Sequence, residues 1–191
     1  MTRSVLLLAA AALGACGDDD YDLYEGEPSE FRTLSVWADP HPDVPPELAR
    51  EACEAWRPEG VLCELADDPL EALVRIHAFT GPCEKNDDGS YTLGYATAGG
   101  DVTLMIECLR RFGGTPIGED LLWPTVAHEV GHQLGLWTHV PAEDGVALMN
   151  PKIHEGLYGI TVLDHEAYLK RDEDGSVLRQ AHGGCTLTRR E

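Results

Sequence analysis

Basic residues, paired cysteine motifs and calcium-loop spacings are scarce or absent in this sequence. The chain has only 14 lysine and arginine residues against 34 aspartate and glutamate residues, which gives a net charge of −20. Nucleic acid is therefore not an expected partner, because its phosphate groups would be repelled. No C-x-x-C spacing occurs, which argues against a zinc cluster built from cysteine. The acidic turns at residues 87–89 and 172–175 lack the twelve-residue EF-hand spacing, so they are interpreted as ordinary turns.

Internal repeats and a second long apolar run are also absent, so the sequence indicates neither a repeat protein nor a membrane-spanning bundle. Hydrophobic residues make up 43% of the 191 residues, which is typical of a globular chain. This length suits one domain with a core of its own. We place that domain at residues 32–191.

The single long apolar run lies at residues 5–13, directly after Arg3. It is typical of a secretory signal and too short to span a membrane as a helix. It ends in the letters LGAC, which resemble the lipobox of bacterial lipoproteins and imply cleavage before Cys16 and lipid attachment to Cys16. We therefore expect a signal peptide at residues 1–15 and an acidic flexible tether at residues 16–31. The expected location is the bacterial cell envelope, with a lipid anchor in the outer membrane.

The domain is predicted to be α/β from its hydrophobic periodicity. Strands are expected at residues 31–39, 60–65, 71–79, 91–97 and 101–107. Helices are expected at residues 46–57, 121–134 and 162–172. Asp120 is a candidate N-cap for the second helix, Pro124 falls in its expected first turn, and Gly135 can end it. The order predicts a mixed, twisted five-stranded sheet with helices packed against it.

The segment HEVGH, from His128 to His132, indicates a metal site on the second helix. The two histidines are four residues apart, so both imidazoles project from one face and can reach one ion. Glu129 projects to the side, where it can take a proton from water at the metal and later pass it to a leaving amine. Two incidental histidines on a core helix are the alternative, but Gly135, a further histidine and a downstream methionine favour zinc.

The combination of HEVGHQLGL, a later histidine and ALMNP resembles the metzincin metallopeptidases, and within them the matrixin-like group. The resemblance covers roughly residues 73–169, with Gly135 at the family's glycine position and Met149 in its Met-turn. It implies a zincin-like fold with an active-site helix, a Met-turn and a C-terminal helix. It also implies zinc as the cofactor and a protein or peptide as the substrate. The strand at residues 99–106 would hold that substrate as an added strand.

The third histidine comes one residue later than in the family pattern, where Thr138 now stands. A neutral hydroxyl is not among the usual zinc ligands in proteins. Side chains alternate along an extended segment, so a turn or bulge within residues 136–138 must absorb the extra residue if His139 is to point at the metal. We expect His139 to be the third ligand. A carboxylate from Glu143 or Asp144 is the alternative.

Disulfides are possible in an exported protein. With Cys16 lipidated, five cysteines remain, so at least one thiol is unpaired in a monomer or links two chains. In the sheet that the resemblance implies, the strands ending near residues 79 and 107 are parallel neighbours. The expected pairs are Cys83 with Cys108 and Cys53 with Cys63, and Cys185 is left over.

The function that we expect is zinc-dependent hydrolysis of peptide bonds by an endopeptidase, with water activated by Glu129. One alternative is a catalytically inactive, lipid-anchored binding protein on a metzincin scaffold. The other is a metal hydrolase with a non-peptide substrate. The presence of Glu129 favours an enzyme over the binding protein, because a structural metal site has no use for a general base.

Overall fold

A computed structural model describes residues 22–170 and 183–187 of the chain. The strands are β1 (Arg32–Ala38), β2 (Val61–Leu65), β3 (Val74–Phe79), β4 (Tyr91–Ala96), β5 (Asp101–Met105) and β6 (Gly183–Leu187). The helices are α1 (Pro46–Cys53), α2 (Ile106–Gly113), α3 (Glu119–Gln133) and α4 (Val162–Lys170), with short 3-10 helices η1 (Glu54–Glu59) and η2 (Ala142–Asp144). The expected signal peptide and Cys16 lie outside the described residues. In the part that is described, no helix is both long enough and apolar enough to cross a membrane.

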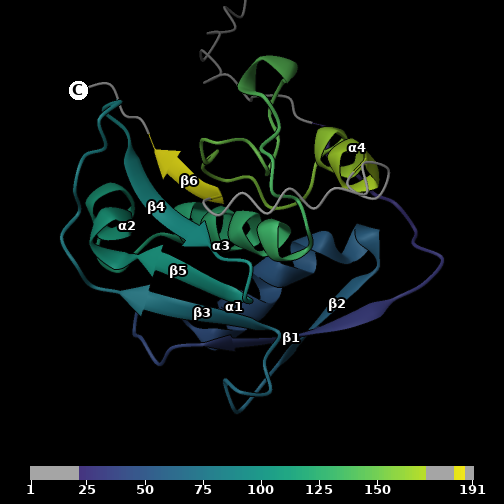
Figure 1. The fold of residues 1–191 in the computed structure, drawn as a ribbon, viewed down its shortest axis with the longest axis horizontal. Helices are drawn as coiled ribbons and strands as arrows, with labels where there is room; N and C mark the ends of the chain where they lie inside the picture. The colour runs from purple at the N-terminus through teal and green to yellow at the C-terminus, as the bar shows by residue number, and fades with distance from the viewer. Residues whose placement is uncertain (1–21, 171–182, 188–191) are drawn as a thin grey trace, which may run out of the picture.

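All strands belong to one mixed sheet in the order β2-β1-β3-β5-β4-β6 (Figure 1). Strands β1, β2, β3 and β5 are parallel, and β4 is antiparallel to β5 and β6. The prediction of a mixed α/β fold with five strands at these places is confirmed. The sixth strand, β6, was not predicted, and its sequence GGCTL shows no clear alternation.

The prediction that the strand at residues 99–106 holds a peptide substrate as an added strand is wrong. β5 lies inside the sheet, because it pairs with β3 on one side and with β4 on the other. Its backbone N–H and C=O groups are therefore already used in the two ladders. The strand that lies outside β5 is β4, which brings a different segment next to the helix that carries the histidines.

Helix α2 was not predicted, since residues 101–107 were expected to be strand throughout. β5 ends at Met105, and the chain turns directly into α2. Ile106 and Leu109 are three residues apart and both fully buried, so one helical face packs into the core. Arg110 fixes the helix from outside, because it forms an ion pair of 2.6 Å with Asp43.

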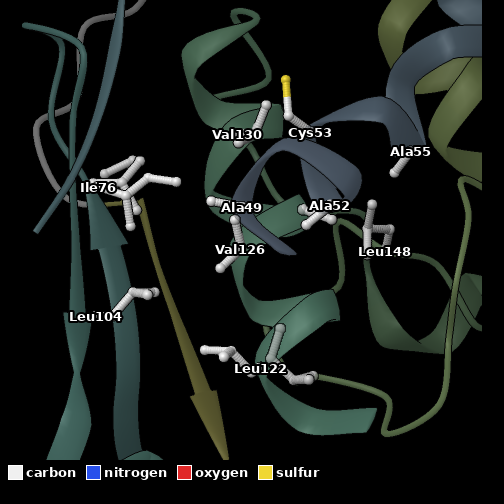
Figure 2. Packing of buried hydrophobic residues seen from close by; sticks show 14 of the residues in the cluster. Ala49, Ala52, Cys53, Ala55, Ile76, Leu104, Leu122, Val126, Val130 and Leu148 are labelled. Atoms are coloured by element: carbon white, nitrogen blue, oxygen red, sulfur yellow. The ribbon is translucent and has the colours of Figure 1, made fainter. Parts of the chain in front are cut away.

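Helix α3 lies within the core, against the sheet and beside α1, which itself packs on β1 and β2 (Figure 2). Leu122 and Val126 face the sheet residues Ile76 and Leu104, and Val130 lies beside α1. Every residue of the segment 124–132 is buried. Such burial on all sides is typical of a central helix, and it removes both histidines and Glu129 from bulk water.

The start of α3 differs from the prediction. The helix begins at Glu119 with Gly118 at the N-cap, so Asp120 is not the cap and Pro124 lies inside the helix. A proline has no N–H to give to the carbonyl four residues earlier, which here belongs to Asp120. That carbonyl accepts a hydrogen bond of 2.8 Å from the backbone N–H of Gly156. The proline thus leaves an acceptor that holds the loop following Met149 against the helix.

Gly131 allows the helix to approach its neighbours closely. A Cβ atom at this position would come within 2.6 Å of Cζ2 of Trp56 and closer still to Sδ of Met149. The Trp56 indole also donates a hydrogen bond of 2.9 Å to the Ala127 carbonyl of the same helix. Helix α3 therefore packs directly against Trp56 and Met149, because Gly131 has no side chain to separate them.

Both predicted disulfides are present. Cys53–Cys63 joins α1 to β2, and Cys83–Cys108 joins the loop after β3 to α2. Each closed loop stabilises the fold by about 2–4 kcal/mol in the chain-entropy description. Disulfides persist in oxidising compartments, so the structure indicates an oxidising or exported environment.

Part of the acidic segment at residues 16–31 contacts the domain. Leu23 forms an antiparallel bridge with Thr161, and the Tyr24 N–H donates to the Ile160 carbonyl at 2.9 Å. The Tyr24 ring also stacks on His165 of α4, with ring centroids 3.7 Å apart. The polypeptide that leads to the domain is therefore bound beside the start of α4.

Candidate metal centre

Three histidines from two segments meet in the interior. His128 and His132 come from α3, and His139 comes from the loop that follows it. Their potential ligand nitrogens all lie within 4.8 Å of one another. The side chains of His128 and His132 are fully buried, and His139 is half-buried. Among the described residues, none of the three Nε2 atoms has a hydrogen-bond partner.

Backbone carbonyls orient the two helical imidazoles. Nδ1 of His128 lies 2.7 Å from the Leu148 carbonyl, and Nδ1 of His132 lies 2.6 Å from the Leu136 carbonyl. A carbonyl oxygen only accepts, so Nδ1 must carry the proton in each ring. The Nε2 atoms are then unprotonated and present their lone pairs to the centre of the cluster. A backbone carbonyl that accepts from one ring nitrogen commonly sets the tautomer of metal-binding histidines in this way.

The surroundings keep these imidazoles neutral. Burial lowers the pKa of His132 to about 4, and it also lowers the pKa of His139. Burial, followed by the neighbouring His132 and His139, holds the pKa of His128 well below its ordinary value. Metal ions bind the neutral form of histidine, so the cluster is in the binding form at neutral pH.

A single metal ion fits between the three nitrogens after a small closure of the cluster. Two nitrogens bound to one zinc at about 2.0–2.1 Å can be at most about 4.1 Å apart, and roughly 3.3 Å apart in a tetrahedral site. The largest separation here is 4.8 Å. In a tetrahedral site the nitrogens would have to approach by up to about 1.5 Å, which rotations of the imidazole side chains can supply. The donor set, its burial and its unpartnered nitrogens thus fit a bound metal ion.

A tight turn after α3 brings His139 to the cluster despite its late place in the sequence. Gly135 has φ of 100°, a left-handed conformation that glycine adopts at no steric cost. The N–H of Trp137 then donates to the Gly135 carbonyl at 3.0 Å, which closes a three-residue turn. The N–H of Val140 donates to the Met149 carbonyl at 2.9 Å. His139 is therefore held between this turn and the segment that contains Met149.

The residues that competed for the place of third ligand lie elsewhere. Thr138 is exposed, and so are Glu143 and Asp144 in η2. Within the described chain, the only group of three or more potential metal ligands is the histidine cluster. The turn therefore absorbs the extra residue and brings His139, and not a carboxylate, to the two helical histidines.

Met149 lies in a turn at residues 147–150, against the helix that carries two of the histidines. Its side chain is fully buried and lies against Gly131, next to His132 in the chain. Asn150 closes the turn, because its backbone N–H donates to the Ala147 carbonyl and its Oδ1 accepts from the Ala147 N–H. The methionine thus supports α3 at Gly131, between the two helical histidines in the sequence.

Asp164 of α4 holds this turn in place, a role that was not predicted from the sequence. Its buried carboxylate accepts backbone hydrogen bonds of 2.8 Å from Leu148 and Met149. It also accepts from the backbone N–H and the hydroxyl of Thr161. Burial raises the pKa of Asp164, while these hydrogen bonds act in the opposite direction. The Leu148 carbonyl orients His128, so the Asp164 carboxylate supports the position of His128 through the turn at residues 147–150.

Glu129 lies next to His128 on α3 and is fully buried. It packs against β4, since a Cβ atom at Gly94 would come within 3.2 Å of Glu129 Oε1. A side chain at residue 94 would compete with the carboxylate for this space. Because Gly94 has no side chain, Glu129 has room between α3 and β4. The sequence alone did not indicate that these two residues are neighbours.

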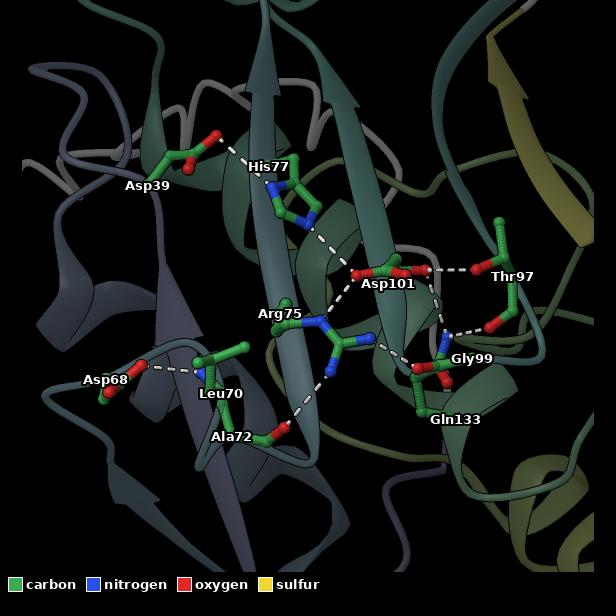
Figure 3. A network of polar contacts seen from close by, with 10 residues as sticks. All are labelled: Asp39, Asp68, Leu70, Ala72, Arg75, His77, Thr97, Gly99, Asp101 and Gln133. Atoms are coloured by element: carbon green, nitrogen blue, oxygen red, sulfur yellow. Dashed lines mark hydrogen bonds and ion pairs between the residues drawn. The ribbon is translucent and has the colours of Figure 1, made fainter.

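His77 lies apart from the cluster, in a polar network centred on β3 and β5 (Figure 3). Its Nε2 lies 3.1 Å from Asp101 Oδ1, and Arg75 donates to the same oxygen at 2.7 Å. Gln133, at the end of α3, donates to the carbonyls of Thr97 and Asp101. His77 thus has the hydrogen-bonding role that its place in a strand predicts.

The first prediction concerns the third ligand. His139→Ala should lower metal content after dialysis sharply, because two imidazoles alone leave a tetrahedral ion two partners short. Thr138→Ala is the matched control, and it should keep the metal because Thr138 is exposed. Metal analysis of both purified variants is the measurement. Full metal content in His139→Ala would show that His139 is not a ligand.

The second prediction concerns Asp164. Asp164→Asn should weaken metal binding by about 10–100-fold, as is usual when a group supporting a ligand is lost. The amide can offer only one oxygen to the N–H groups of Leu148, Met149 and Thr161. Asp144→Asn, an exposed change of the same kind, is the control. Competition with a chelator measures the affinity, and equal affinities for the two variants would refute the role.

Comparison with known proteins does not assign this chain to a family. The chain matches no protein-family model, and a search of curated protein sequences finds no match either. The structure itself shows a mixed α/β fold, two disulfides and three histidines that could hold a metal ion. What the site does must therefore be inferred from its geometry.

Proposed function

We propose that the protein is a zinc-dependent endopeptidase of the metzincin type, most similar to the matrixin-like group. The observation that carries the proposal is the buried carboxylate of Glu129 beside three inward-facing imidazoles. Three neutral nitrogen ligands are the usual donor set of a catalytic zinc site, which keeps one position open. A purely structural zinc site has four protein ligands instead.

Zinc, when bound, supplies a Lewis acid that polarises a carbonyl group and lowers the pKa of water. The chain's own contribution is to hold the ion and to move the proton. His128, His132 and His139 would bind the ion through Nε2. Glu129 would take a proton from the attacking water and deliver it to the amine that leaves as the peptide bond breaks. Its burial strengthens this transfer, since no bulk water competes for the carboxylate.

A peptide is the substrate class that the surroundings favour. Strand β4 passes beside Glu129 and contributes Gly94 to its environment. An extended peptide that lies along such a strand is held by its main chain, so many sequences can bind. A peptide bond at this place would lie near both the carboxylate and the histidine cluster. This arrangement favours an endopeptidase over a hydrolase of small non-peptide substrates.

The third prediction tests the role of Glu129. Glu129→Ala should lower the rate of peptide cleavage by about 10²–10⁴-fold while the protein keeps one zinc ion. The measurements are cleavage of a peptide library and zinc analysis of the same samples. Glu119→Ala, at the exposed start of the same helix, serves as the control. Loss of zinc together with activity would show that Glu129 is a ligand and not the base.

We also propose that Cys16 carries a lipid anchor that keeps the domain at a bacterial membrane, the outer membrane in particular. The two disulfides support an oxidising compartment, and the sequence LGAC after an apolar run supports the attachment site. The docking of Leu23 on Thr161 would then hold the domain close to the anchored end.

The fourth prediction follows from this anchor. Cys16→Ser should move the protein from the membrane fraction to the soluble fraction or block its processing, because the sulfur would carry the lipid. Cys185→Ser is a control that leaves the proposed attachment site intact. Fractionation and intact mass measure the outcome. A normally processed Cys16→Ser protein that stays in the membrane fraction would contradict the proposal.

A further inference from the structure

The outer edge of β4 is occupied by the chain itself. One side of β4 pairs with β5, and the other side pairs with β6 in antiparallel orientation. The register runs from Tyr91 opposite Leu187 to Ala96 opposite Gly183. β6 therefore covers β4 from its first residue to its last (Figure 1).

This occupied edge passes the candidate metal centre. Gly94 lies against the Glu129 side chain, and in the β4–β6 register it pairs with Cys185. Helix α3 lies close to both β4 and β6. The backbone of β6 thus runs beside Glu129, the residue that we propose as the proton acceptor. A peptide paired with β4 would lie along the same line.

The pairing that holds β6 is of a kind that a peptide can replace. Backbone N–H and C=O groups make the ladder, and these groups are the same in any extended chain. The ladder is irregular between Thr92 and Gly94, and such irregularities interrupt strand pairing. β6 also begins with two glycines, Gly183 and Gly184, which lose the most backbone freedom on ordering.

The two edges of the sheet differ in how firmly they are attached. At one edge, β2 is joined covalently to α1 through Cys53–Cys63. At the other edge, β4 contains no cysteine, so no disulfide can join it to β6. Release of β6 would leave the order of the remaining five strands unchanged. An edge strand without a covalent link can open while the other strands stay in place.

We propose that β6 is an intramolecular occupant of a peptide-binding edge on β4, and that a peptide substrate binds by displacing it. The inference rests on the proposed function, because it assigns the same edge to the substrate. The protein with β6 in place is the closed form. A peptide that pairs with β4 competes with β6 and stabilises the open form.

A disulfide across the two strands tests this directly in the full chain. Thr92 and Thr186 are paired in register, and residues directly opposite in an antiparallel pair have Cα atoms about 4.5–5.5 Å apart, which a disulfide spans. The variant is Thr92→Cys with Thr186→Cys, made with Cys185→Ser to avoid wrong pairing. The two single changes in the same background are the controls.

We expect the oxidised double variant to cleave peptides at least about 10-fold more slowly than either control, because the open form is removed. Zinc content should be equal in all three proteins. A locked protein that cleaves as fast as its controls would overturn the inference. Absence of cleavage in the controls and the natural chain would instead count against the proposed function.

Amide hydrogen exchange supplies a readout that does not depend on activity. We expect the amides of β6 to exchange at least about 100-fold faster than those of β3 and β5, and to slow on locking. Exchange of β6 as slow as that of β3 would overturn the inference, even in a protein that cleaves nothing. The two measurements therefore separate failure of this inference from failure of the proposed function.

Discussion

The interior holds three imidazole nitrogens that face one another and have no hydrogen-bond partner among the described residues. A buried polar group left without a partner costs about 1–3 kcal/mol, and three in one place would be a heavy cost in a small domain. A shared cation removes that cost, because each lone pair then has a partner. The surrounding structure holds the nitrogens in this arrangement. The segment 124–132 of α3 is buried, and two backbone carbonyls fix the direction of its histidines.

The support for this centre extends from the N-terminal segment to the last described helix. Leu23 pairs with Thr161, Thr161 donates to Asp164, and Asp164 accepts from the turn that contains Met149. The Leu148 carbonyl of that turn orients His128. Each contact joins segments that are distant in the sequence, so the position of one imidazole depends on the packing of α4 and of the chain that leads into the domain.

Several parts of this arrangement could be predicted from the sequence, because they depend on local periodicity. Alternation identified β3, where Val74 and Ile76 are buried, and spacing of four placed two histidines on one helical face. The Cys83–Cys108 disulfide followed from the resemblance to a known sheet order, and Cys53–Cys63 from the expected helix and the strand after it. Helix α2 was missed because its apolar residues continue directly from those of β5. β6 was missed because two glycines and a polar sequence give no periodic signal.

The remaining features of the site depend on backbone geometry, which could not be predicted from the residue types alone. The direction of His139 is set by the turn at Gly135–Trp137, which the spacing alone left open. Asp164 appeared only as an acidic residue near a helix start, whereas its partners are backbone N–H groups of another segment. The Asp120 carbonyl gained its partner because Pro124 lies inside the helix, and not in the first turn.

The central claim is that His128, His132 and His139 bind one metal ion through nitrogen. X-ray absorption spectroscopy of the zinc-loaded protein measures this most directly, because it reports the type, number and distance of the atoms bound to the metal. The account predicts three imidazole nitrogens at about 2.0–2.1 Å and one further oxygen or nitrogen ligand. A sulfur atom at about 2.3 Å, or a shell with fewer than three imidazoles, would contradict it.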